Sequence, residues 1–239
     1  VVDVQDLLAV IDQWGPCPSP EDCFDRQDTY HEQDPFLLTD KPQFGTSVSI
    51  DGDWAIVGAP EADCTDGNDY TNCGAATIFK RTWGGTGGTW EQFKVLRDTN
   101  EENDFQFGNA VSISYDPETG EVTAVVSGRR CGFGDDCVSP GTVLIYEYSG
   151  SGDEWPETVI TASDGKSEDG FGRALDIDGK TIVISNSERG LTCPALGGYS
   201  AQVYVVEKVG NSWIEQQILC WPEYENSSTS QGWDLSIDN

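Results

Sequence analysis

Residues 44–60 of the chain read FGTSVSIDGDWAIVGAP, and the same pattern returns three more times. The second copy, at 107–128, reads FGNAVSISYDPETGEVTAVVSG, and the third, at 171–187, reads FGRALDIDGKTIVISNS. A fourth copy begins at Gln231 and reads QGWDLSIDN. The glycine in the second position of each copy recurs after 63, 64 and 60 residues. A fixed period of this size is typical of repeat architectures, which build rigid binding surfaces from one stacked unit.

Each repeat predicts four short strands. In the first repeat, Val48 and Ile50 alternate with serines, and Asp51-Gly52 is a tight-turn dipeptide that leads into the next strand. The predicted strands are 46–50, 54–57, 75–81 and 90–96, then 110–115, 122–127, 142–148 and 157–161, then 174–177, 181–185, 201–206 and 213–219. Four antiparallel strands per repeat is the layout of a propeller blade. The predicted fold class is therefore all-β, with about three and a half blades of the β-propeller type.

The ends of the first copy resemble a known repeat. Phe44-Gly45 opens this copy and Gly58-Ala59-Pro60 closes it, with alternating apolar residues between them. This pattern resembles the FG-GAP repeat, the blade unit of integrin-α-like β-propellers. The second and third copies keep Phe-Gly and lose Gly-Ala-Pro, and the fourth keeps only Gly232. The resemblance covers residues 35–239 and implies blades at about 44–97, 107–162 and 171–220, with the start of another at 231–239.

Aromatic residues recur in phase with the repeat. Residues at the same position of each repeat should occupy equivalent places in the structure, because each copy builds the same unit. We therefore expect two sets of equivalent buried side chains, Phe44, Phe107 and Phe171 in one and Trp90, Trp155 and Trp213 in the other.

The N-terminal residues form a separate segment. Residues 4–14 carry apolar side chains at helical spacing, and Gly15 and Pro16 end the predicted helix. Residues 1–16 resemble the second half of a dockerin-type or EF-hand-like calcium motif, in which Asp3 and Asp6 would be late ligands. The alternative is a small amphipathic helix that packs on the propeller. Residues 17–34 are predicted to be a Pro- and Asp-rich linker.

Calcium is the one cofactor that the sequence suggests. Many integrin-like blades carry an Asp-rich calcium loop between their first two strands, but here that connection is a short hairpin such as 50–53. Other acidic stretches run over 63–69, 98–104 and 164–169, and the first contains Asp63, Asp66 and Asp69. Two readings stay open for them, because acidic residues and glycines can bind calcium or simply form turns.

The chain contains 8 Cys, which predicts a disulfide framework and an oxidising, extracellular compartment. Closeness in sequence predicts three pairs, and elimination predicts the fourth. The four pairs are Cys17–Cys23, Cys64–Cys73, Cys131–Cys137 and Cys193–Cys220. Two of them would close the same loop, between the second and third strands of successive blades.

Charge and the scarcity of histidine narrow the function classes. The net charge of −29 argues against nucleic acid and anionic membrane surfaces as partners, and no apolar run approaches the length of a membrane span. A catalytic triad would need His31, the single histidine, which lies in the predicted linker. The acidic residues offer no distinctive pair for glycoside hydrolysis. We therefore expect a protein that is not an enzyme.

The functional hypothesis is an extracellular, non-catalytic module that acts in adhesion or recognition of glycan or protein. The alternative is a structural subunit of a surface layer or extracellular filament, and a carbohydrate-active enzyme component is a distant third. Because the chain lacks methionine and its last repeat is incomplete, we expect either an excerpt of a longer protein or closure by assembly. In both cases residues 35–39 (PFLLT) should pair with strands elsewhere, by self-association through sheet edges or within the parent protein.

Overall fold

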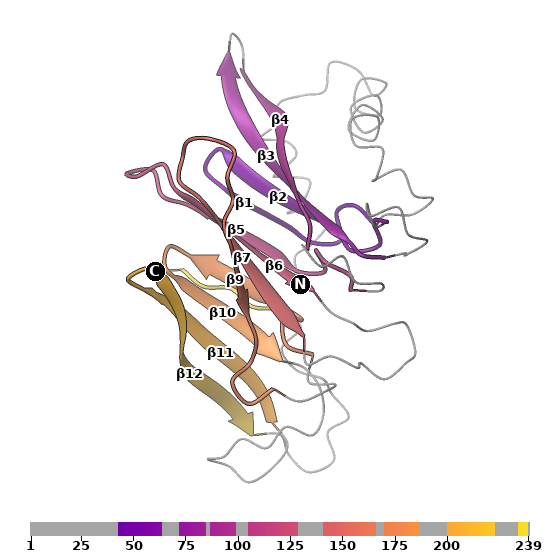
Figure 1. The fold of residues 1–239 in the computed structure, drawn as a ribbon, viewed down its shortest axis with the longest axis vertical. Coiled ribbons are helices and arrows are strands. Elements are labelled where there is room, and N and C mark those ends of the chain that lie inside the picture. Colours follow the sequence, from indigo (N-terminus) through magenta and orange to yellow (C-terminus); the bar gives the residue numbers. More distant parts are fainter. Residues whose placement is uncertain are drawn as a thin grey trace.

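The computed structural model describes residues 43–63, 72–84, 87–98, 105–128, 141–165, 170–186, 200–222 and 234–238. These residues form three four-stranded antiparallel sheets, one from each of the first three repeats (Figure 1). The first sheet contains β1 (Val48–Asp51), β2 (Trp54–Ala59), β3 (Ala75–Gly84) and β4 (Gly87–Leu96). The second contains β5 (Val111–Tyr115), β6 (Val122–Gly128), β7 (Thr142–Tyr148) and β8 (Glu157–Ile160). The third contains β9 (Leu175–Asp178), β10 (Thr181–Asn186), β11 (Ser200–Val209) and β12 (Ser212–Pro222).

The twelve strands confirm the predicted all-β fold with propeller-type blades. Within each sheet the strands pair in the order of the chain, so every neighbouring pair is antiparallel and consecutive. The short turns of the sequence account for the pairing of the first two strands of each sheet, since a tight hairpin can join only antiparallel neighbours. The predicted N-terminal helix, the 17–34 linker and residues 35–39 lie outside the described residues.

The first strand of each blade lies on the inside of the array, beside the first strand of the next blade. β1 contacts β5, and β5 contacts β9, so the three inner strands run side by side while the other strands fan outward (Figure 1). The middle strand is covered from both sides. Four successive residues of β5, Val111 to Ser114, are all buried, whereas the residues of β1 alternate between exposed and half-buried.

The hydrophobic core lies between the blades. One cluster joins Trp54, Ile56 and Ile78 of the first blade to Phe107 and other apolar residues of the second. A second cluster joins the other face of the second blade to the third blade, and Phe171 lies within it. Burial between sheets is the main favourable term for such stacking, at about 25 cal/mol per Å² of apolar surface. Contact with neighbouring blades therefore contributes to the stability of each blade.

The expectation of three equivalent buried phenylalanines is confirmed for two of them and wrong for the third. Phe107 and Phe171 are fully buried, but Phe44 is 40% exposed. Phe107 packs against Tyr146, and Phe171 packs against Tyr204, each edge to face within its own blade. No described blade precedes the first one, so the surface that would cover Phe44 is absent from this part of the chain.

The tryptophan set is equivalent in register. Each tryptophan of the set packs on one residue from the same position of the third strand of its blade. These pairs are Arg81 with Trp90, Tyr148 with Trp155 and Lys208 with Trp213. The contact is a cation over a ring in the first and third blades and a ring stack in the second. The predicted burial is confirmed for Trp155 and Trp213 and wrong for Trp90, which is half-buried.

Neighbouring inner strands are joined by side chains that accept main-chain hydrogen bonds, an arrangement that we call the interblade ladder. Within its sheet, the inner strand of a blade pairs only with the second strand of the same blade. Every other main-chain N–H group of the inner strand therefore points away from that partner and needs an acceptor. The bonds between the first two blades are Val111 N to Ser47 Oγ (3.0 Å), Ile113 N to Ser49 Oγ (3.3 Å) and Tyr115 N to Asp51 Oδ2 (2.7 Å).

The interblade ladder repeats between the second and third blades. Ile177 N donates to Ser112 Oγ at 3.3 Å, and Gly179 N donates to Ser114 Oγ at 3.0 Å. Ser112 also donates its own hydroxyl proton to Asp176 Oδ1 at 2.7 Å. The acceptors Ser49, Ser112 and Asp176 occupy the same position in their repeats, so one residue position supplies the link in each blade.

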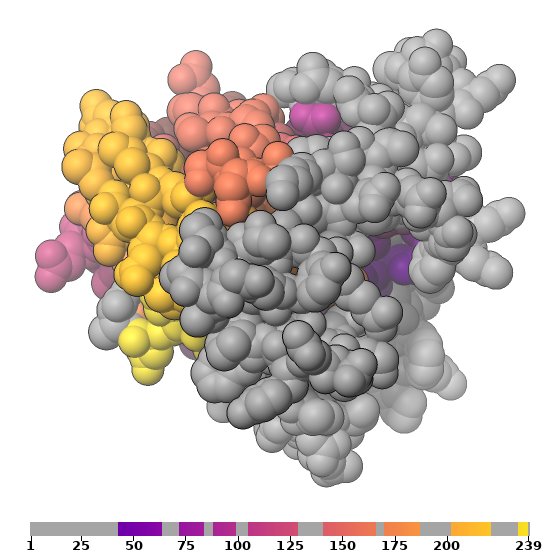
Figure 2. All heavy atoms as spheres, turned by 90° about the horizontal axis from the view of Figure 1, so that it is seen from below, coloured from indigo at the N-terminus to yellow at the C-terminus, as the bar shows by residue number. Residues whose placement is uncertain are grey.

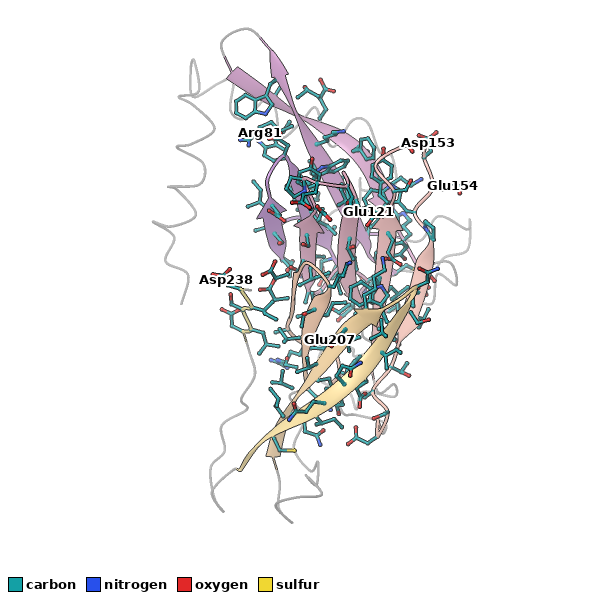
Figure 3. All side chains as sticks on the ribbon, turned by 90° about the vertical axis from the view of Figure 1, so that its left-hand side faces the viewer. Arg81, Glu121, Asp153, Glu154, Glu207 and Asp238 are labelled. Carbon is teal, nitrogen blue, oxygen red and sulfur yellow. The ribbon has the colours of Figure 1, made fainter. Side chains whose placement is uncertain are left out.

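The fourth repeat continues the interblade ladder. Ile237 N donates to Asp176 Oδ2 at 2.9 Å, which is the same bond that Ile113 and Ile177 make to their preceding blades. Residues 234–238 therefore occupy the position of a fourth inner strand, next to the third blade (Figure 2). Figure 3 shows that the side chain of Asp238 lies at the margin of the molecule and points away from the three sheets.

Candidate functional site

The short hairpins of the three blades come together at one end of the inner strands. Each hairpin follows the end of an inner strand, and the strands of each sheet are antiparallel and consecutive, so the hairpins between the first and second strands all lie at this end. The hairpin connections are Asp51 to Trp54, Tyr115 to Val122 and Asp178 to Thr181. The interblade ladder holds their first residues in register, since Asp51 bonds to Tyr115 and Ser114 bonds to Gly179.

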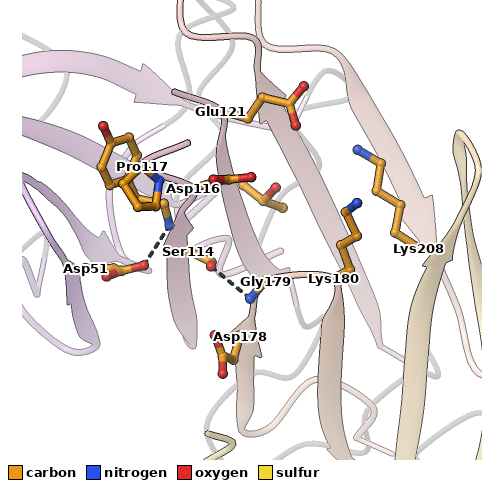
Figure 4. A pocket seen from close by; sticks show the side chains of 11 residues that line it. Asp51, Ser114, Asp116, Pro117, Glu121, Asp178, Gly179, Lys180 and Lys208 are labelled. Atoms are coloured by element: carbon orange, nitrogen blue, oxygen red, sulfur yellow. Dashed lines mark hydrogen bonds between the residues drawn. The ribbon is translucent and has the colours of Figure 1, made fainter. Parts of the chain in front are cut away.

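A pocket of about 250 Å³ opens between these hairpins (Figure 4). It is lined by residues from all three blades, and most of them are polar. The lining residues are Asp51, Ser114, Tyr115, Asp116, Pro117, Glu121, Thr123, Asp178, Gly179, Lys180 and Lys208. The pocket lies across two blade boundaries, so it exists only when three consecutive blades are docked.

Asp116 shapes the hairpin that forms one wall of the pocket. Its Oδ1 accepts hydrogen bonds from Glu118 N at 2.8 Å and Thr119 N at 3.3 Å, which is the local side-chain capping that favours aspartate in turns. The bond from Glu118 N, with further help from Thr119 and from the charge of Lys180, lowers the pKa of Asp116 below its ordinary value. Asp116 is therefore an ionised hydrogen-bond acceptor at neutral pH rather than a proton donor.

Two lysines supply the positive charge of the pocket. Lys180 comes from the hairpin between β9 and β10, and Lys208 comes from β11 beside it, where Lys208 N donates to Lys180 O at 2.9 Å. Figure 4 shows both ammonium groups on the same side of the pocket as the carboxylate of Glu121. The ammonium group of Lys208 also forms an ion pair with Glu147, so part of its charge is already balanced.

The chemistry of the site suits polar recognition. Asp51 and Ser114 are occupied by main-chain donors of the next blade and serve as structural acceptors. Glu121 and Lys180 are exposed and stand at the mouth with a carboxylate and an ammonium group. Such a pair can accept hydrogen bonds from hydroxyl groups and donate hydrogen bonds to ether or carbonyl oxygens. The ring of Tyr115 adds one apolar surface to the wall.

The candidate calcium ligands are almost entirely outside the described residues. Asp3, Asp6, Asp66 and Asp69 lie there, and only Asp63 is described, with its main-chain oxygen accepting a hydrogen bond from Arg97 at 2.8 Å. Within the described ranges no group of three or more His, Cys, Asp or Glu side chains is arranged to hold a metal ion. The calcium hypothesis for the loops and for the N-terminal segment stays a prediction.

Two of the eight cysteines fall within the described ranges. Cys73 and Cys220 are both disulfide-bonded, and the other six cysteines lie outside those ranges. The pairing scheme, which places Cys64 with Cys73 and Cys193 with Cys220, therefore stays a prediction. The described residues also contain no helix of the length and hydrophobicity that a bilayer span requires.

Sequence reasoning did not find the pocket. Its residues come from three repeats, and Asp51 and Lys208 are far apart in the chain. The hairpin dipeptides Asp51-Gly52 and Asp178-Gly179 were recognisable as turns, but nothing local indicates that both turns face one cavity. The phase of the repeat was the available signal, because equivalent hairpins of stacked blades must lie at the same end.

Comparison with known proteins agrees with this architecture. The family model described as the FG-GAP repeat matches residues 40–79 and 155–205 of the chain. The first match spans β1, β2 and the first half of β3, and the second spans the start of β8 to the middle of β11. No curated protein sequence matches the chain.

Proposed function

Because the chain is built from FG-GAP repeats that form propeller-type blades, we propose that it is an extracellular, non-catalytic module that recognises the polar end of a glycan. The pocket between the hairpins is the single observation that carries this proposal. Its walls combine exposed carboxylate and ammonium groups with a tyrosine ring, a set that suits the hydroxyl groups and the apolar face of a sugar.

The size of the pocket limits what it can hold. Sites for whole small ligands measure about 300–1,000 Å³, whereas this pocket measures about 250 Å³. It therefore accommodates one terminal group of a larger ligand. Three carboxylates besides Asp51 line it against two lysines, one of them paired, so a neutral polyhydroxyl group fits better than a polyanion. A protein ligand that inserts a polar side chain is the related possibility for the same site.

Several features support the absence of catalysis and the extracellular setting. A general acid needs a raised pKa, and hydrogen bonding moves the pKa of Asp116 in the opposite direction. The disulfide bonds of Cys73 and Cys220 are typical of proteins in oxidising compartments. The strongly negative net charge favours solubility and disfavours anionic partners.

The test is a glycan array probed with the whole chain, followed by affinity measurements with variants. Glu121→Gln and Lys180→Ala should each weaken binding by about tenfold, because each removes one charge-assisted hydrogen bond. Glu118→Gln is the matched control, since Glu118 lies in the same hairpin but does not line the pocket. Equal binding by the Glu121 and Glu118 variants would exclude the pocket as the site.

A structural subunit of a surface layer or filament is the second candidate function. The observation that favours it is the exposed apolar surface of the first blade, where Phe44, Val48 and Ile50 are each at least 40% exposed. Exposed apolar patches of this kind mark interaction surfaces. Electron microscopy of the concentrated protein tests this role, and long regular assemblies are the expected result.

A further inference from the structure

The first blade presents an unfinished copy of the surface that joins the other blades. Val48 is 52% exposed and Ile50 is 45% exposed, whereas their counterparts Val111 and Ile113 are 4% and 2% exposed against the first blade. We define the leading face as Phe44, Val48 and Ile50 together with the outward N–H groups of β1. The repeat makes this face equivalent to two surfaces that are buried elsewhere in the same molecule.

Among the residues that the structure describes, none accepts a hydrogen bond from the outward N–H groups of the leading face. Ser47 pairs with β2, because Gly58 N donates to Ser47 O at 2.8 Å. Main-chain N–H groups alternate in direction along β1, so those of Val48, Ile50 and Gly52 point away from β2. The equivalent groups of the second blade donate to serine and aspartate side chains of the first blade. A strand with hydroxyl or carboxyl side chains at alternate positions would complete the leading face in the same way.

The fourth repeat carries those acceptors. Ser236 holds the position of Ser49, Ser112 and Asp176, and Asp238 holds the position of Asp51 and Ser114. Both side chains are exposed, while Ile237 N is bound to the third blade through Asp176. Residues 234–238 are thus attached to the third blade through Ile237 N and expose the side chains of Ser236 and Asp238.

From this complementarity we infer that the leading face binds a second copy of the chain, head to tail, through residues 234–238 of its fourth repeat. Ser236 Oγ of one copy accepts a hydrogen bond from Ile50 N of the next copy, and Asp238 accepts one from Gly52 N. The apolar side chains of Val48 and Ile50 then lie at the contact between the two copies, in the place that Val111 and Ile113 hold against the apolar residues of β2 and β3 in the first blade. The interface joins two different surfaces, so repetition gives a ring or an open filament.

This inference does not rest on the pocket or its ligand, and failure of glycan binding would leave it standing. The contact also differs from pairing at an outer sheet edge, because it uses side-chain acceptors of one inner strand and the main chain of the next. Charge adds a condition. With a net charge of −29, copies repel one another at long range, so association should strengthen as salt screens the charge.

The test measures self-association of the whole chain by sedimentation velocity over a range of concentrations. The wild-type chain should form dimers or larger species, and Val48→Asp should weaken association at least about tenfold, because it places a charge in an apolar contact. Val159→Asp is the matched control, since Val159 is 55% exposed on β8 of the middle blade. Near-ultraviolet circular dichroism confirms that both variants stay folded.

Cross-linking identifies the partner strand. Ser49 Oγ and Ser112 Oγ lie 3.4 Å apart across an existing blade boundary, so Ser49 of one copy and Ser236 of the other should be similarly close. A mixture of the single variants Ser49→Cys and Ser236→Cys should form a disulfide between chains, identified by peptide mapping. A strictly monomeric chain, equal association of the Val48 and Val159 variants, or no disulfide between positions 49 and 236 in the mixture of Ser49→Cys and Ser236→Cys would overturn the inference.

Discussion

Val48 and Val111 occupy the same position in successive repeats, yet Val48 is 52% exposed and Val111 is 4% exposed. Both belong to an inner strand, and both follow a Phe-Gly pair by three residues. The difference arises entirely from the neighbour, because Val111 lies against the first blade and Val48 faces no described blade. The position of a blade in the array, rather than the local sequence, therefore decides how much each repeated residue contributes to stability.

Replacement of Phe107 by alanine should destabilise the chain by about 3–5 kcal/mol, because a fully buried ring is removed from the core between two blades. Phe44→Ala is the matched control and should cost less than half as much, since Phe44 is 40% exposed and its ring contact is with Phe79 of the same blade. Equilibrium denaturation with disulfides intact measures both. Similar losses for the two variants would contradict the packing described above.

Gly108→Ala should lower the melting temperature far more than Gly45→Ala. The two glycines share a left-handed backbone, with φ of 93° and 94°, so the conformational cost of about 1–2 kcal/mol is common to both. A Cβ on Gly108 would lie 2.3 Å from the main-chain oxygen of Ala75 in the first blade, whereas a Cβ on Gly45 meets nothing within 4 Å. Differential scanning calorimetry gives the comparison, and equal shifts would show that the blades can separate to admit the methyl group.

Asp176→Ala should release the fourth inner strand while leaving the contact between the first two blades in place. Asp176 Oδ2 accepts the only described hydrogen bond of Ile237 N, and a bond to a carboxylate contributes about 1.5–3 kcal/mol. Amide exchange at Ile237 should therefore accelerate about tenfold or more, while Ile113 N, bound to Ser49, stays protected. Hydrogen exchange with mass spectrometry reports both segments. Unchanged exchange at Ile237 would mean that other contacts hold the strand.

No disulfide should join two different blades. Non-reducing peptide mapping should recover Cys64 linked to Cys73 and Cys193 linked to Cys220, together with the pairs Cys17–Cys23 and Cys131–Cys137. Each bond closes a short loop, so its loss should cost about 2–3 kcal/mol. A bond that joins two different blades would refute the scheme, although it would agree with the bonded state of Cys73 and Cys220.

The strands and the phase of the blades could be predicted from the sequence because their signals are local. Alternation such as Val48-Ser49-Ile50, followed by Asp51-Gly52, specifies a hairpin within a few residues. The repeat then extends that assignment to every blade, and all twelve strands lie where the pattern predicts them. The FG-GAP match at residues 40–79 and 155–205 rests on the same local pattern.

Only the tertiary structure decided which copies of a repeated residue are buried and where the blades form a pocket. Phe44 and Phe107 have the same local sequence signal, but burial depends on a neighbouring blade that no local pattern describes. The pocket joins Asp51 to Lys208 through two blade boundaries, and the serines and aspartates of the interblade ladder fix those boundaries. Each of these hydrogen bonds joins two residues that are close in space but far apart in the sequence, so the bonds form only once the blades are stacked.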